Sequence, residues 1–253
     1  MRRKIAVAVL LLVGLCALFA PVIAPFDYSR QFRDSPHAPA GGQFLMGTDD
    51  LGRDRFSRLI YATRVSILLA PAAALVSVAL ALLLCGFSSL TTLCLSLPWI
   101  FLFIILRALL PLNTRPLASI LLTFALMGVA GWAWPARIFG ASIKQMKQSG
   151  WLLQARASGL SGTRIALVHV WPHLRAIALA QFRVLVPAYI LSEASLGLLG
   201  LGVAEPLPSW GNLLAELQRP EAVRANPWVL APLGLLMIVM ICLEMLQSVE
   251  VVT

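Results

Sequence analysis

The sequence predicts an all-α integral membrane protein with six transmembrane helices. Hydrophobic residues make up 59% of the 253 residues and charged residues only 12%, and the mean hydropathy is +0.85. A soluble domain of this length needs more polar surface than that. The apolar residues also gather in stretches close to the ~20 residues that a helix needs to cross ~30 Å of hydrocarbon. The six stretches are 5–23, 65–87, 93–112, 117–136, 176–203 and 228–246.

The first stretch follows Arg2, Arg3 and Lys4, which favours a cytoplasmic N-terminus. This beginning also imitates a secretory signal, but cleavage after Ala24 would place Pro25 at the next position, where processing is poor. We therefore expect a retained first helix and keep a cleaved signal as the alternative.

Six spans place the N- and C-termini in the cytoplasm. The outer segments are then 26–64, 111–116 and 204–227, and the inner ones are 88–92 and 137–175. Segments 26–64 and 137–175 each hold six Lys or Arg residues, but the first also holds five aspartates and the second has no acidic residue. No Asp or Glu occurs between Arg55 and Ser192.

The end of the first outer segment predicts an amphipathic helix at the membrane surface, leading into the second span. Asp54 can cap its beginning. Apolar side chains recur at helical spacing on one face and arginines on the others. The apolar face consists of Phe56, Leu59, Ile60 and Thr63, and the arginines are Arg55, Arg58 and Arg64.

The segment 137–175 predicts two cytoplasmic helices joined by a glycine turn. Residues 154–158 have helical composition and stop at Gly159. A second helix over 163–170 follows Gly162 and ends before Pro172, because proline disfavours helix at the residue before it. Two helices delimited by glycine and proline in this way indicate a docking surface for another protein rather than a merely solvated basic loop. Its basic residues include Lys144, Lys147, Arg156, Arg164 and Arg175.

Three separated motifs resemble those of bacterial ABC-importer permeases of the dipeptide, oligopeptide and nickel group, in the subunit type of the C-chain. Residues 47–59 are similar to G-T-D-x-x-G-R-D-x-x-S-R-L. Residues 154–172 are similar to the E-A-A-x-x-x-G loop with a proline thirteen residues after the glycine. Residues 199–211 are similar to L-G-L-G…P-x-P-S-W-G. The resemblance covers nearly the whole chain.

The resemblance implies the type I ABC-importer permease architecture and a role for each motif. The loop near 154–172 would be the coupling helices that seat in a cytoplasmic ATPase. Its residues in this chain are Gln154, Ala155, Arg156, Ala157, Gly159, His169 and Pro172. The external motif supplies Gly47, Thr48, Asp49, Gly52, Arg53 and Asp54.

The chain departs from the family pattern in three places. Gln154 stands where glutamate is usual and Arg156 where the second alanine is usual. The inner connection 88–92 is short, and the sequence ends at Thr253 without the usual charged tail. These departures favour a second hypothesis, a non-transporting or regulatory membrane subunit derived from the same family.

Other constellations give weaker signals. Arg183 and Glu193 fall within an apolar stretch, where ionisable residues commonly face a bundle interior or a translocation path. Arg107 and Glu244 are equally consistent with snorkelling at a span end. His169 and His173 are four residues apart, but Pro172 lies between them and no third ligand is near, so we expect no metal site. A membrane-embedded enzyme would need clustered polar residues that the spans lack.

The chain is therefore predicted to comprise 1–64, a first span with its external segment, and 65–253, a permease core of five spans. It would form half of a translocation pathway for peptides or a related small solute such as nickel, without a catalytic or P-loop site of its own. The expected partners are a second permease subunit, cytoplasmic P-loop ATPases that bind ATP and Mg²⁺, and an extracytoplasmic binding protein. The expected location is the bacterial inner membrane.

Overall fold

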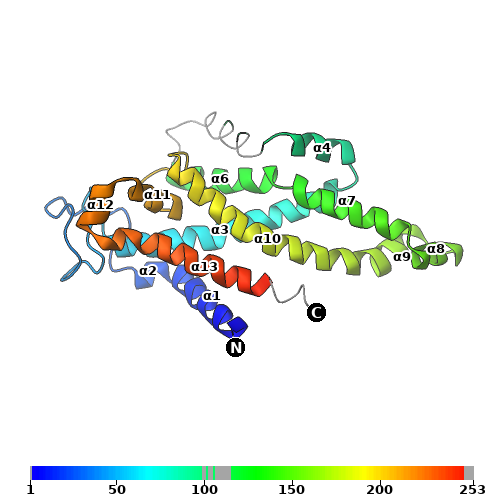
Figure 1. The fold of residues 1–253 in the computed structure, drawn as a ribbon, viewed down its shortest axis with the longest axis horizontal. Helices are drawn as coiled ribbons and strands as arrows, with labels where there is room; N and C mark the ends of the chain where they lie inside the picture. The colour runs from blue at the N-terminus through cyan, green and yellow to red at the C-terminus, as the bar shows by residue number, and fades with distance from the viewer. Residues whose placement is uncertain (1, 99–100, 102–104, 106–114, 248–253) are drawn as a thin grey trace. The chain divides into compact units, whose positions relative to one another are not determined.

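The computed structural model of the chain describes residues 2–98, 101, 105 and 115–247, and its regular elements are helices (Figure 1). Within these residues extended pairing is limited to two isolated bridges, Gly41–Phe44 and Thr48–Asp54. The longer helices are α1 (Arg2–Leu18), α3 (Arg55–Leu84), α4 (Ser88–Ser96), α6 (Pro116–Ala130), α7 (Ala133–Lys147), α8 (Gly150–Ala157), α10 (Trp171–Leu198) and α13 (Ala231–Gln247). The shorter ones are α2 (Ala20–Ile23), α9 (Gly162–Ile165), the π-helix η1 (Ala166–Val170), α11 (Trp210–Ala215), η2 (Glu216–Gln218), α12 (Pro220–Ala225) and η3 (Pro227–Leu230).

Four helical stretches in the described part of the chain are long and apolar enough to cross a membrane. They are Arg55–Leu84, Pro116–Lys147, Gly162–Leu198 and Pro227–Gln247. The predicted first span is helical as α1 and α2, with a break at Phe19. The predicted third span, 93–112, lies largely outside the described residues, as does Arg107. The count of six spans therefore stays a prediction.

The predicted surface helix and second span are one continuous element, α3, of 30 residues. The prediction that Asp54 caps its beginning is confirmed, because Asp54 Oδ2 accepts a hydrogen bond of 2.8 Å from the backbone N–H of Ser57. The helix leads into the second span, as predicted, and its place at a membrane surface stays a prediction. Arg55 and Arg58 are buried, with exposed fractions of 9% and 1%, since carboxylates from distant segments surround them.

Two predicted inner connections are also corrected. Residues 88–92 are not a loop, because α4 begins at Ser88 directly after the turn at Gly86 and Phe87. The segment 137–175 begins as helix, because α7 continues to Lys147. Helix therefore occupies more of this predicted inner segment than the sequence pattern indicates.

The prediction that a helix ends before Pro172 is wrong as well. Helix α9 passes through the π-helix η1 into α10, which begins at Trp171. Pro172 therefore falls in the first turn of α10, a position where its missing N–H is tolerated. The wider π turn just before it changes the hydrogen-bond register, as such insertions do, and the chain stays helical past the proline.

The chain divides into two compact units. The first comprises Met1–Ala70, Arg107–Phe124 and Pro187–Thr253, and the second comprises Pro71–Leu106 and Ala125–Val186. In the first unit α1 packs against α13. In the second unit α4 packs against α7. There the Ser77 hydroxyl also donates to the Gly128 carbonyl at 2.6 Å.

Candidate functional site

The external motif begins with two glycines that the fold requires. Gly47 and Gly52 have φ values of +74° and +72°, which L-residues with a side chain rarely adopt. A Cβ at Gly47 would lie 2.4 Å from the Ala38 carbonyl oxygen, and one at Gly52 would lie 2.2 Å from that of Phe32. These glycines let the motif fold back tightly against the preceding part of the outer segment.

Asp49 is the centre of the motif. Its side chain is nearly fully buried, and its Oδ1 accepts hydrogen bonds from the backbone N–H groups of Leu51 at 3.0 Å and Arg53 at 2.8 Å. Its Oδ2 lies 2.7 Å from Arg53 Nε and 3.7 Å from Arg58 Nε. One carboxylate therefore organises the turn and faces two guanidinium groups.

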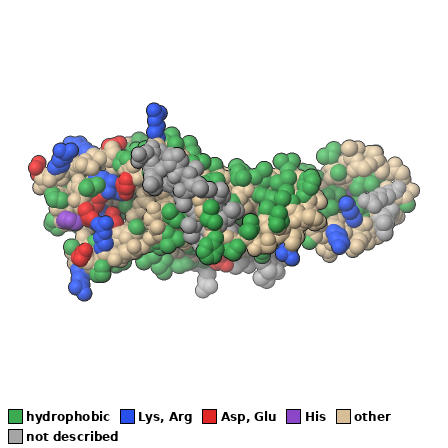
Figure 2. Space-filling view, turned by 90° about the horizontal axis from the view of Figure 1, so that it is seen from above, with side chains coloured by type: hydrophobic (Ala, Val, Ile, Leu, Met, Phe, Trp, Pro, Cys, Tyr) green, Lys and Arg blue, Asp and Glu red, His purple; other side chains and the backbone are tan. Residues whose placement is uncertain are grey.

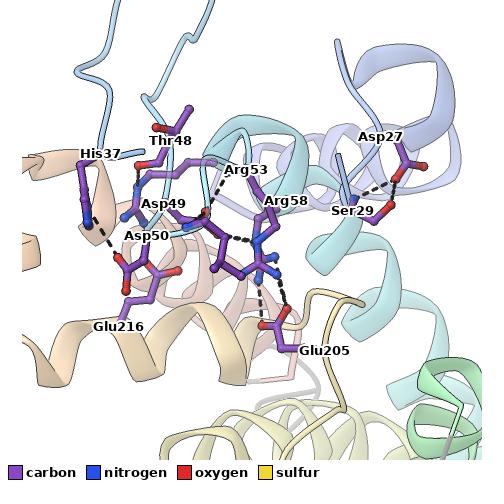
Figure 3. A network of polar contacts seen from close by, with 12 residues as sticks. Asp27, Ser29, His37, Thr48, Asp49, Asp50, Arg53, Arg58, Glu205 and Glu216 are labelled. Atoms are coloured by element: carbon purple, nitrogen blue, oxygen red, sulfur yellow. Dashed lines mark hydrogen bonds and ion pairs between the residues drawn. The ribbon is translucent and has the colours of Figure 1, made fainter. Parts of the chain in front are cut away.

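Glu205 completes this arrangement from a distant part of the chain. Its carboxylate is 3.0 Å from Arg58 Nη2 and 2.5 Å from Arg53 Nη1. Figure 3 shows Arg53 and Arg58 lying between Asp49 and Glu205. We call Asp49, Arg53, Arg58 and Glu205 the arginine–carboxylate cluster. Two cations and two anions balance, so the buried Asp49, Arg53 and Arg58 are neutralised with the help of the half-exposed Glu205.

The charge of Arg53 follows from this geometry. Burial alone would lower the pKa of its guanidinium, but the neighbouring carboxylates of Asp49 and Glu205 raise the pKa above its ordinary value. Arg53 therefore stays cationic at any pH at which the protein is folded. The cluster is a permanent electrostatic contact rather than a switch.

Further polar contacts join the motif to the segment 209–227. Thr48 Oγ1 donates to the Ser35 carbonyl at 2.6 Å, and the Thr48 carbonyl accepts from Arg55 Nε at 3.0 Å. Arg55 also pairs with Glu216. Nearer the surface, Arg219 pairs with Asp50. The external motif thus fastens the outer segment to later parts of the same unit.

The third motif ends one long helix and packs a short one against it. After α10, the N–H of Leu201 donates to the Leu196 carbonyl at 2.8 Å and that of Gly200 to the Gly197 carbonyl at 3.0 Å. With Gly200 at φ +72°, this is a Schellman helix end. A Cβ on Gly197 would lie 2.2 Å from Gly211, so the backbones of α10 and α11 approach as closely as two glycines allow.

Two buried side chains secure this crossing. The fully buried Trp210 donates from its indole Nε1 to Thr63 Oγ1 of α3 at 3.1 Å. Glu193 is also fully buried and faces Ser66, Ser209 and the backbone of Gly211. Neither carboxylate oxygen has a hydrogen-bond partner among the described residues. Glu193 therefore lies at a packed junction in this chain, and its predicted place on a translocation path stays a prediction.

The predicted coupling segment forms a helical hairpin, α8–α9, continued by η1 into α10 (Figure 1). Its turn is at Gly159, whose φ is +73° and around which the space is open. Ser161 caps α9 by accepting from the Arg164 N–H at 3.4 Å. The turn thus needs glycine for its backbone conformation and not for room.

The inside and the outside of this hairpin differ in chemistry. Leu152 and Ile165 are buried, and the Trp151 and His169 rings lie 5.9 Å apart. Several large apolar side chains are nevertheless exposed, namely Trp151, Leu167, Val168 and Trp171. The second unit contains seven Lys or Arg and no Asp or Glu. Most red side chains in Figure 2 are intermixed with blue ones in one cluster, while other blue side chains have no red neighbour.

The structure thus places the predicted residues in two separate groups. Gly47, Thr48, Asp49, Gly52, Arg53 and Asp54 come together in the first unit. The second unit holds the predicted coupling residues, from α8 through η1 to the first turn of α10. They are Gln154, Ala155, Arg156, Ala157, Gly159, His169 and Pro172. Gln154 and Ala157 are exposed, Arg183 is half-buried on α10, Glu244 is exposed on α13, and His173 is exposed.

Sequence reasoning missed the partners of the external motif. Glu205 and Glu216 are two of only 11 acidic residues, yet both bind arginines near the beginning of α3. The small number of acidic residues in the chain could have indicated these partners. Buried arginines need carboxylates, and the few acids outside segment 26–64 could have been weighed as partners.

Four apolar helices of spanning length in the described part of the chain define a helical membrane protein. The family comparisons make this class specific. The model of the binding-protein-dependent transport system inner membrane component matches residues 63–249. That of the N-terminal transmembrane domain of oligopeptide transport permease C matches residues 3–40. The chain belongs to this family of ABC-importer permeases, whose members are membrane components and not themselves enzymes.

Individual relatives agree with the family assignment. The chain is 33% identical to the di/tripeptide transport system permease protein DppC of Pseudomonas aeruginosa, over 89% of this chain and 78% of that protein. It is 31% identical to the oligopeptide transport system permease protein OppC of Escherichia coli, over 96% and 83%. For OppC of Bacillus subtilis the identity is 29%, over 93% and 79%.

Proposed function

We propose that this chain is one of two permease subunits of an ATP-driven peptide importer and that its α8–α9 hairpin seats on a cytoplasmic ATPase. The observation that carries the proposal is the hairpin itself. It has a left-handed glycine turn and an exposed Trp151, an exposed Trp171 follows at the beginning of α10, and the unit that contains them has no acidic residue. An exposed apolar patch with unbalanced positive charge is typical of a protein interface.

The substrate class follows from the relatives. The three described above are named for di/tripeptide or oligopeptide transport. We therefore assign peptides, and nickel finds no support among these three. An extracytoplasmic binding protein would deliver the peptide to the outer side, where the external motif holds the segments 26–54 and 205–219 in a fixed arrangement.

In the proposed mechanism, ATP binding and peptide passage belong to different chains. ATP and Mg²⁺ would bind to the partner ATPases, and this chain together with a related permease would form the pathway. ATP binding moves the ATPases, and the hairpin transmits that movement to α7 and α10, with which it is continuous along the chain. The bundle then shifts between inward-open and outward-open states, as a two-state element biased by a ligand on another subunit. Both termini of the chain would be cytoplasmic.

The test combines affinity purification with uptake. The tagged chain is recovered from its native membranes in mild detergent, and co-purifying proteins are identified by mass spectrometry. We expect a second permease and P-loop ATPases, together with uptake of a labelled tripeptide and not of Ni²⁺. Recovery of the chain without ATPases would contradict the importer assignment and favour a regulatory subunit of the same ancestry.

The role of the hairpin is tested with two matched glycines. Both Gly159 and Gly162 have open space where a Cβ would go, but only Gly159 has a positive φ. Gly159→Val should distort the turn and abolish ATPase recovery and uptake, whereas Gly162→Val should retain both. Normal coupling in Gly159→Val, or equal losses in both variants, would refute the docking role.

A further inference from the structure

The second unit contains an open cavity of about 440 Å³ that is separate from the hairpin residues discussed above. One wall is the turn from α3 into α4, including Cys85, Ser88 and Thr92. The other wall is a face of α7, including Arg137, Lys144 and Lys147. At ~30 Å³ for each molecule of liquid water, the cavity has room for about 15 waters. It could therefore hold a polar group much larger than a single ion.

The cations that line this cavity have no anion to balance them. Arg137, Lys144 and Lys147 are spaced seven and three residues apart, so they follow one face of α7. No ion pair joins any of the three to another described residue. Their own unit has no acidic residue by sequence, so a counter-ion must come from outside that unit.

The opposite wall adds groups suited to a phosphate. Ser88 lines the cavity at the first turn of α4, which no side chain caps. Uncapped backbone N–H groups at a helix beginning add to the positive potential that the three cations create. Gly140 permits the two walls to approach, because a Cβ there would lie 3.0 Å from the Cys85 carbonyl oxygen.

Exposed apolar side chains next to the cavity indicate that its ligand is amphiphilic. Leu83, Phe87 and Leu90 are 76%, 61% and 42% exposed in the segment that forms one wall. A soluble anion would neutralise the cations but would make no contact with these apolar side chains. A phospholipid satisfies both features, because its phosphate is anionic and its acyl chains cover apolar side chains.

We propose that this cavity, which we call the basic pocket, binds the phosphate headgroup of an anionic phospholipid, with the acyl chains lying along Leu83, Phe87 and Leu90. The proposal requires only that the chain is embedded in a bilayer. It holds or fails independently of the importer's substrate and of ATPase docking. The bound lipid supplies the negative charge that the second unit lacks.

The test uses the full chain reconstituted in bilayers of phosphatidylcholine with a minor fraction of phosphatidylglycerol. After extraction in mild detergent, mass spectrometry gives the ratio of the two retained lipids. The wild-type chain should retain phosphatidylglycerol well above its input ratio. Lys144→Gln should lower this enrichment by up to about fivefold, the effect of one charge near an anionic membrane. Combined Arg137→Gln, Lys144→Gln and Lys147→Gln should return it to the input ratio.

A matched control removes the same charge elsewhere. Lys4→Gln, Arg164→Gln and Arg175→Gln neutralise three exposed cations that do not line the pocket, and this variant should keep the wild-type enrichment. A second pocket variant, Ala141→Trp, fills the cavity without changing any charge and should also abolish enrichment. Enrichment that survives both pocket variants, or falls equally in the control, would overturn the proposal.

Two further outcomes would assign the pocket to another ligand. Inorganic phosphate alone, titrated into the detergent-solubilised chain, should bind only weakly. If it binds strongly and displaces phosphatidylglycerol, the pocket takes a free phosphate. If the triple pocket variant keeps its lipid ratio but loses co-purifying ATPase, the pocket is a protein contact. Either result would refute the lipid assignment.

Discussion

The external motif and the α8–α9 hairpin are both rich in arginine, but the protein treats the charge differently in the two regions. In the first, Arg53, Arg55 and Arg58 are buried and each meets a carboxylate of the same unit. In the second, the cations belong to a unit without a single acidic residue. Charge that is balanced internally stabilises one arrangement of the chain. Charge that is left unbalanced attracts other molecules.

The difference separates two meanings of a sequence motif. Almost every residue of the external motif has a structural task in this chain, from the two left-handed glycines to the cap at Asp54. In the hairpin motif, only the turn and a small core are held by contacts within the chain, and its exposed side chains have the role that we propose in ATPase docking. Substitutions should therefore change stability in the first region and association in the second.

The largest expected effect is that of Asp49→Ala. This change leaves Arg53 and Arg58 buried without one of their two carboxylates, and breaking a buried pair from one side costs about 3–5 kcal/mol. Thermal unfolding of the purified chain in detergent should show a large loss of Tm. The control is Asp50→Asn, whose partner Arg219 is mostly exposed and whose loss should cost about 0–1 kcal/mol. Equal effects would show that the cluster does not stabilise the fold.

A smaller loss is expected for Gly197→Ala. The new Cβ would collide with the backbone of Gly211, and overpacking of this kind costs about 1–3 kcal/mol. Gly234→Ala on α13 is the matched control, because nothing lies within 4 Å of its Cβ position and alanine favours helix. The unfolding midpoint should fall in the first variant and stay or rise in the second. A stable Gly197→Ala would mean that α10 and α11 are not in contact.

Arg53→Lys should cost about 1 kcal/mol, because an ammonium group cannot serve both Asp49 and Glu205 with a planar fork. The cost should also depend on pH. In the wild type, the raised pKa of Arg53 keeps its contribution constant between pH 7 and 11. Free lysine has a pKa near 10.4, and pairing raises it, so the variant's contribution is complete below about pH 10 and is lost as the pH rises further. Tm differences between wild type and variant at pH 7 and 11 measure this, and a constant difference would contradict it.

The smallest effect on stability should come from salt. Raising ionic strength from 0.1 to 1 M shortens the Debye length from about 10 Å to about 3 Å. The buried ion pairs of the first unit are hardly screened, so the Tm of the isolated chain should stay nearly constant. Recovery of ATPases with the chain should decrease over the same range. Salt-insensitive recovery would show that apolar contacts, rather than unbalanced cations, hold the hairpin on its partner.

Much of the local structure could be predicted from the sequence. The helical stretches, the cap at Asp54 and the turn at Gly159 all depend on residues within one or two helical turns of each other. Hydropathy patterns and helix-capping rules apply directly to such short segments. The helix across Pro172 was missed because a π-helical insertion compensates for the proline, and no local pattern announces it.

The arrangement of the site could not be predicted in the same way. The arginines near the beginning of α3 were assigned to the faces of an amphipathic helix opposite its apolar side chains, because helical spacing alone cannot reveal a partner more than 140 residues later. Their burial depends on Glu205 and Glu216, which only the fold brings near. Similarly, the close approach of Gly197 and Gly211 is a property of two helices crossing and not of either helix.

The long separation within the arginine–carboxylate cluster has a consequence for synthesis. Arg58 and Glu205 are 147 positions apart, and at ~5–20 residues per second the ribosome needs roughly 7–30 s to bring the second after the first. During that interval Asp49 is the one of the cluster's two carboxylates that has been synthesised. Arg58 therefore has only half of its final set of carboxylates until residue 205 is made, and the external motif is completed late in synthesis.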